Sequence, residues 1–167
     1  MGSRFHLAQV NVGRMLAGRE DPAMAGFFTR LDEINQLAES SIGFVWRLKD
    51  DSGNATYLRP FDDDSILINL SVWESVEALA AFTYRSAHKE LIAGRKKWFE
   101  DFGQPFLALW WIPAGSIPGL DEAKERLDYL QAHGPTPFAF AFKTAFPAPS
   151  DDDARPERLR AKAGSGH

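Results

Sequence analysis

Residues 66–79 have the sequence Ile-Leu-Ile-Asn-Leu-Ser-Val-Trp-Glu-Ser-Val-Glu-Ala-Leu, and this stretch decides the fold. In residues 66–73 the side chains alternate between two faces, because successive residues of a strand point to opposite sides of a sheet. One face is aliphatic throughout, whereas the other also carries Asn69, Ser71 and Trp73. The stretch therefore predicts a strand with core on one side and polar and aromatic groups on the other, followed directly by a helix. We expect the helices to pack on the aliphatic face, and a second sheet or a second subunit to meet the polar face around a pocket.

Further strands and helices are predicted on both sides of this stretch. Alternating or helical spacing of apolar residues predicts strands at 5–12, 43–49, 55–59, 106–112 and 138–143, and helices at 22–40, 75–85, 86–99 and 121–132. The order β-α-β-β-α-β, with an added C-terminal helix and strand, predicts an α+β, ferredoxin-like fold. We expect one domain over residues 4–146 and a disordered tail over the acidic, proline-containing residues 147–167.

Composition excludes several classes of function. With 167 residues, 44% of them hydrophobic, the chain can bury a full core. A formal charge of −4 and a pI near 5.6 argue against nucleic acid as the main partner, because phosphate binding needs clustered Lys and Arg. The absence of cysteine excludes disulfides, thiolate metal sites and cysteine nucleophiles. With no long apolar run, no membrane is expected as partner, and the predicted location is cytoplasmic.

Residues 71–79, with the sequence SVWESVEAL, and the following Phe82, Ser86 and His88 carry a family resemblance. They resemble the dimeric α/β-barrel superfamily, which includes antibiotic-biosynthesis monooxygenases. Four further stretches extend the similarity over nearly the whole chain, to a bacterial branch labelled a domain of unknown function; these are residues 84–88, 97–99, 109–115 and 133–137. The resemblance implies a homodimer whose two sheets pair into a barrel, with the pocket between sheet and helices or inside the curve of the sheet.

The members of this superfamily differ in chemistry, so the resemblance implies a choice of cofactors. Its members include cofactor-free oxygenases of aromatic polyketides, enzymes that degrade heme and enzymes that use heme as a cofactor. The heme-degrading members resemble this chain at Asn11 in the first strand and at His88, whose counterpart ligates iron. They have a helical Trp close to the position of Phe82 here. We expect no cofactor as the first choice and heme, with His88 as axial ligand, as the alternative.

His88 is the main candidate for chemistry. An imidazole titrates near neutral pH, so His88 could shuttle a proton or bind a heme iron. Alternatively, it bonds a backbone carbonyl where two helices meet. On a continuous helix, Tyr84 and Arg85 would approach His88, and Arg85 could hold a carboxylate. A surface salt bridge is the other interpretation of Arg85. A zinc site is not expected, because His6, His88 and His133 lie far apart in the sequence.

Amide and aromatic side chains complete the candidate site. Asn11 and Asn69 could orient a ligand carbonyl or an oxyanion, or could satisfy backbone groups instead. We place Trp73 in the pocket as a stacking surface. Trp110 and Trp111 are neighbours on a strand and point to opposite faces, so at most one lines the pocket, and Trp111 is our choice.

Three functions follow from these features. The first is a monooxygenase-like enzyme for an aromatic or conjugated substrate, with His88 removing a proton and Asn11 or Asn69 stabilising the oxyanion. The second is a heme protein with His88 as axial ligand. The third is a non-catalytic dimeric module that binds a hydrophobic metabolite.

Overall fold

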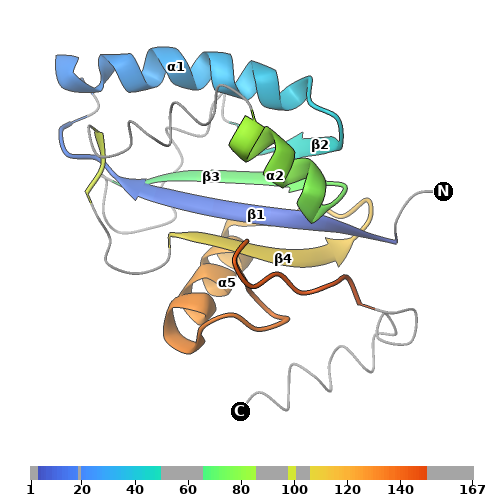
Figure 1. Cartoon of the computed structure of the whole chain (residues 1–167). Helices are drawn as coiled ribbons and strands as arrows, with labels where there is room; N and C mark the ends of the chain where they lie inside the picture. Colours follow the sequence, from blue (N-terminus) through green and yellow to red (C-terminus); the bar gives the residue numbers. More distant parts are fainter. Residues whose placement is uncertain (1–3, 19, 50–65, 86–97, 101–105, 150–167) are drawn as a thin grey trace.

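The computed structural model describes residues 4–18, 20–49, 66–85, 98–100 and 106–149. In chain order the elements are β1 (Phe5–Arg14), α1 (Pro22–Glu39), β2 (Phe44–Arg47), β3 (Ile66–Trp73), α2 (Val76–Arg85), β4 (Leu107–Pro113) and α5 (Leu120–His133). The strands form an antiparallel sheet in the order β2-β3-β1-β4 (Figure 1). This arrangement confirms the α+β, ferredoxin-like prediction. Pairing of two copies into a barrel stays a prediction.

Helix α1 begins where the sequence predicts it. The Asp21 Oδ1 atom accepts a hydrogen bond of 2.9 Å from the backbone N–H of Ala23, and Pro22 takes the first helical position. Proline fits there because its missing N–H would have no partner within the helix. The apolar stripe of α1 then buries Met24, Phe27 and Ile34. Local chemistry therefore sets the start of the helix, and burial of its stripe holds it on the sheet.

Asp21→Ala is expected to lower the free energy of unfolding by about 1 kcal/mol, because it removes this N-terminal hydrogen-bond acceptor. Asp21→Asn keeps an acceptor oxygen at the same place and is expected to stay close to wild type. Urea denaturation followed by circular dichroism measures both variants. An equal loss in both would assign the effect to the charge of Asp21 instead of the cap.

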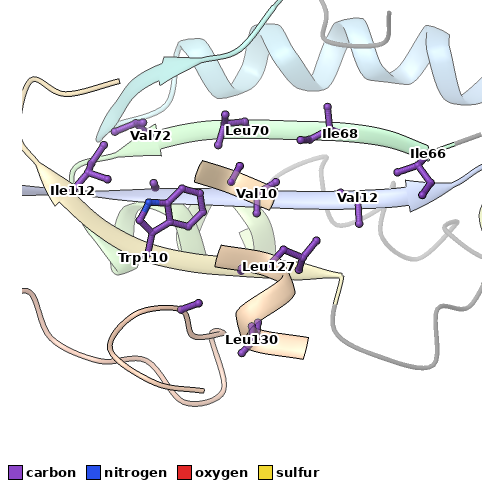
Figure 2. Close-up of a cluster of buried hydrophobic side chains, with 14 residues drawn as sticks. Val10, Val12, Ile66, Ile68, Leu70, Val72, Trp110, Ile112, Leu127 and Leu130 are labelled. Carbon is purple, nitrogen blue, oxygen red and sulfur yellow. The ribbon is translucent and has the colours of Figure 1, made fainter. Parts of the chain in front are cut away.

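One face of the sheet is a continuous aliphatic layer covered by α5. Figure 2 shows this layer, which is made by Ala8, Val10, Val12, Ile66, Ile68, Leu70, Val72, Ala108, Trp110 and Ile112. Ala123, Leu127 and Leu130 of α5 belong to the same cluster. The indole N–H of Trp110 donates to Glu122 Oε2 at 2.9 Å, so a polar atom inside this layer keeps a partner. The aliphatic face of β3 is core, as its sequence predicts.

Helices α1 and α2 cover the opposite face of the sheet. Ile34 and Ala38 of α1, with Leu79 and Phe82 of α2, pack in one cluster with Trp73. This corrects two expectations, since the helices were expected on the aliphatic face and a second sheet or subunit on this one. The physical reason is that Leu7, Trp73 and Leu109 give this face enough apolar surface to pack two helices despite its polar residues.

The C-terminal part adds an edge contact instead of a full strand. Phe140 pairs with Leu109 of β4 through backbone hydrogen bonds of 2.7 and 2.9 Å, and Phe140 is fully buried. The expected strand at 138–143 is thus reduced to an isolated bridge. The expected strand at 55–59, most of the helix at 86–99 and the tail beyond residue 149 lie outside the described residues. None of the described helices has the length and apolarity that crossing a bilayer requires.

Candidate functional site

A cavity of about 410 Å³ lies between the sheet and helices α1 and α2. Its floor is the polar face of β1 and β3. Its walls are rich in aromatic rings, because eight aromatic side chains belong to the described lining: Phe27, Phe44, Trp73, Phe82, Tyr84, Phe99, Phe106 and Phe142. Trp73 and Phe82 stack on each other with ring centroids 5.2 Å apart and planes 27° apart. The result is an apolar chamber over a polar floor.

The floor is a hydrogen-bonded network of side chains from two neighbouring strands. Strand register places Gln9 opposite Ser71 and Asn11 opposite Asn69. The amide nitrogen of Gln9 donates to Asn69 Oδ1 at 2.6 Å and to Ser71 Oγ at 2.9 Å. The amide nitrogen of Asn11 donates to Gln9 Oε1 at 3.0 Å and to Asn69 Oδ1 at 3.3 Å. Trp73 joins the network by donating its indole N–H to Ser71 Oγ at 2.9 Å.

The network uses most of its donors in bonds between its own side chains and leaves one donor group and one acceptor for the cavity. Both N–H bonds of the Gln9 amide and both of the Asn11 amide are used inside the network. The Nδ2 group of Asn69 and the Oδ1 atom of Asn11 make no hydrogen bond within the described part of the chain. Neither atom is completely buried. Both residues line the cavity. Asn69 therefore has two N–H donors, and Asn11 an acceptor, that are not used within the described residues and that belong to the lining of the cavity.

The structure brings together five of the residues predicted for the site. Asn11, Asn69, Trp73, Phe82 and Tyr84 all line the cavity. Tyr84 is 55% exposed and packs edge-on against Phe142 with ring centroids 5.6 Å apart, so the two rings lie at the rim. The polar face of β3 thus lines this cavity, and the ligand-binding roles of these five residues stay predictions.

Three predicted residues are placed elsewhere or lie outside the described part. Trp110 and Trp111 point to opposite faces, as predicted. Trp111 shares the face of the cavity but is not among its lining residues, and its indole N–H donates to the Phe146 carbonyl at 2.9 Å. Arg85 ends α2, but its side chain and the whole of His88 lie outside the described residues.

Several lining residues were not singled out from the sequence. Phe27, Leu31 and Ile34 of α1 line the cavity together with Asn35. Their helical spacing is visible in the sequence, but spacing does not say against which face of the sheet a helix packs. Lys143 also lines the cavity, and the only signal for it is that it interrupts the apolar run near residue 142.

The described lining residues do not fit a metal or a heme by themselves. They include no His, Asp or Glu, and no group of three His, Cys, Asp or Glu side chains occurs anywhere in the described residues. An axial imidazole for heme would have to come from His88, outside this part of the chain. We therefore assign no chemistry through a metal here.

Comparison with known proteins gives a family and remote structural neighbours. A family model described as "Domain of unknown function (DUF3291)" matches residues 6–156. A conserved protein from Methanosarcina mazei Go1 is 13% identical, with 66% of this chain and 93% of that chain covered and a TM-score of 0.45. A protein from Chloroflexus aurantiacus J-10-fl, provisionally described as an antibiotic biosynthesis monooxygenase, is 13% identical, with 69% and 98% covered and a TM-score of 0.40. No curated protein matches the chain.

Proposed function

This chain belongs to the family of the domain of unknown function DUF3291, whose name specifies no reaction, and we propose that it is an oxygenase of flat, conjugated small molecules. The observation that carries the proposal is the amide nitrogen of Asn69, which has no hydrogen-bond partner among the described residues and lies on the floor of an aromatic cavity. The sequence resemblance to monooxygenases of the dimeric α/β-barrel superfamily supports the same reaction class.

The cavity suits a flat ligand in size and in surface. Its volume of about 410 Å³ lies within the range of roughly 300–1,000 Å³ that is usual for small-molecule sites. The lining rings that keep exposed surface, such as Tyr84 and Phe106, favour conjugated ligands, because flat surfaces pack closely and ring quadrupoles interact. Trp73 and Phe82 are buried and stack on each other, so they support the wall behind this surface. A polar floor under aromatic walls gives such a ligand one fixed orientation.

In the proposed reaction, Asn69 acts on the carbonyl of the substrate. One of its N–H groups would donate to the carbonyl oxygen and stabilise the negative charge that forms there when a neighbouring C–H bond loses its proton. Because the described lining offers no His or carboxylate as base, we assign the proton transfer to His88. Asn69 would thus stabilise the enolate, and Gln9 and Asn11 would hold the Asn69 side chain in place through its oxygen.

Molecular oxygen is the oxidant in this proposal. The enolate carbon forms a bond to oxygen and gives a hydroperoxide. Loss of the second C–H proton then cleaves the O–O bond, so that CH2 and O2 become C=O and H2O. The carbon loses four electrons and O2 gains four. One oxygen atom becomes the new carbonyl and the other leaves as water.

Oxygen uptake with anthrone tests the proposal. Anthrone has a CH2 group conjugated to a carbonyl through two rings, and its oxidation to anthraquinone consumes one O2. We expect the protein to accelerate oxygen uptake above the spontaneous rate, with anthraquinone as product. Comparison with His88→Ala shows whether His88 is the base, since equal rates would exclude it. No acceleration with anthrone or with any conjugated ligand that co-purifies with the protein would leave a binding module as the better interpretation.

A further inference from the structure

The two charged residues in the described lining of the cavity have the same sign. Arg47 and Lys143 are cationic, and the described lining residues include no Asp or Glu. The whole chain is acidic, with 23 Asp and Glu against 19 Lys and Arg and a net charge of −4. A cavity whose charged side chains are positive favours an anionic ligand, because these side chains attract an anion and repel a cation.

The two cations enter the cavity from opposite edges of the sheet. Arg47 belongs to the edge strand β2, where it pairs with Ser71 and so points to the same face as the polar floor. Lys143 follows the bridge between Phe140 and Leu109 on the other side of β4. A ligand that fills the cavity therefore spans a polar floor with a positive charge toward each end.

Of these two cationic side chains, Lys143 is the better candidate to bind an anionic group. The Nε and Nη2 atoms of Arg47 donate to Glu39 Oε1 at 3.1 and 3.0 Å, so a carboxylate already balances part of that charge. Lys143 has no hydrogen bond or ion pair within the described part of the chain. Its neighbour Phe142 forms the aromatic rim with Tyr84. Lys143 is exposed and, like Phe142, belongs to the lining of the cavity.

We propose that the ligand of this cavity is a conjugated organic anion, such as an aromatic carboxylate or phenolate, whose charged group binds Lys143. This inference rests on the proposed function for the place of the site and adds the charge of the substrate. A charge-assisted hydrogen bond from the ammonium group is stronger than one between neutral groups. The rings would lie between the aromatic walls while the anionic group reaches the rim at Lys143.

Two fluorescent probes that differ only in one anionic sulfonate group can test this inference. 1-Anilinonaphthalene-8-sulfonate is an anion, and N-phenyl-1-naphthylamine has the same rings without the sulfonate. Both become fluorescent in apolar cavities, so titration gives a Kd for each. We expect Lys143→Met to weaken binding of the sulfonate about tenfold, as loss of a hydrogen bond to a charged group predicts. Binding of the neutral probe is expected to change less than twofold.

Two further variants separate the site from other effects. Lys124→Met on α5 makes the same change in net charge outside this cavity and is expected to leave both Kd values at wild type. Lys143→Arg keeps the positive charge and is expected to retain most of the sulfonate affinity. Raising the salt concentration should weaken binding of the sulfonate probe but not of the neutral probe, because salt screens the interaction between charges.

The possible outcomes distinguish this inference from the proposed function. If the neutral probe binds and Lys143→Met does not alter sulfonate binding, the anion inference is overturned while the cavity remains a ligand site. Equal weakening of both probes would assign Lys143 a structural role and also overturn it. If neither probe binds the wild-type protein, the cavity itself fails as a ligand site, and the proposed function fails with it.

Discussion

Replacing Asn69 with alanine is expected to lower the kcat for a conjugated ketone by about 10²–10³-fold, the usual effect of losing one oxyanion donor. The reason is that Asn69 offers its two N–H groups to the cavity, whereas the N–H groups of Gln9 and Asn11 are used inside the network. The charge on the substrate oxygen grows in the transition state, so we expect kcat to fall much more than KM changes. Oxygen uptake with anthrone measures both constants.

Two controls isolate the donor from the network that holds it. Asn11→Ala removes a bond to Asn69 Oδ1 but no donor to the substrate, so it should lower kcat less than Asn69→Ala does. Asp21→Ala lies at the start of α1, away from the cavity lining, and should leave kcat unchanged. A kcat for Asn69→Ala within threefold of wild type would be incompatible with the assigned role of Asn69.

Leu127→Ala is expected to lower the free energy of unfolding by about 2–5 kcal/mol, because it leaves a cavity where α5 meets the aliphatic face of the sheet. Leu127 is only 1% exposed and lies in the same cluster as Val10 and Leu70 (Figure 2). Urea denaturation gives the change directly, and a constant m-value would show that the denatured state is unaffected.

The adjacent helix residue provides the matched control. Asp128 is exposed, and Asp128→Ala is expected to change stability by less than about 0.5 kcal/mol. Because Leu127 and the ligand cavity lie on opposite faces of the sheet, folded Leu127→Ala should bind the neutral probe N-phenyl-1-naphthylamine with an unchanged Kd. A loss of less than 1 kcal/mol would mean that α5 contributes little to the cover of this face.

The sequence predicts features that depend on neighbouring residues. Alternation over residues 66–73 predicts a strand with two different faces, and the structure has that strand with those faces. The Asp21-Pro22 pair predicts the start of α1, and adjacency predicts that Trp110 and Trp111 separate. Each of these follows from the geometry of one helix or one strand.

Features that depend on contacts between segments far apart in the sequence could not be predicted from local geometry. An apolar stripe shows that α1 packs on something, but the choice between two faces of a sheet depends on the whole topology. The contacts among Gln9, Asn69 and Ser71 require the register between β1 and β3. Lys143 reaches the cavity only because the chain returns to pair with β4. The role of His88 stays a prediction.

Strand β3 has a further consequence for how this protein can evolve. Its odd-numbered positions form the cavity side and include Asn69, Ser71 and Trp73, whereas its even-numbered positions belong to the layer beneath α5. Substitutions at odd positions can change the shape and polarity of the cavity, and with it the ligand that the proposed function requires, without altering the α5 layer. Insertion or deletion of one residue would exchange the two sets and damage both at once. Divergence among relatives of this chain should therefore be found at alternate positions of β3, and its length should be nearly constant.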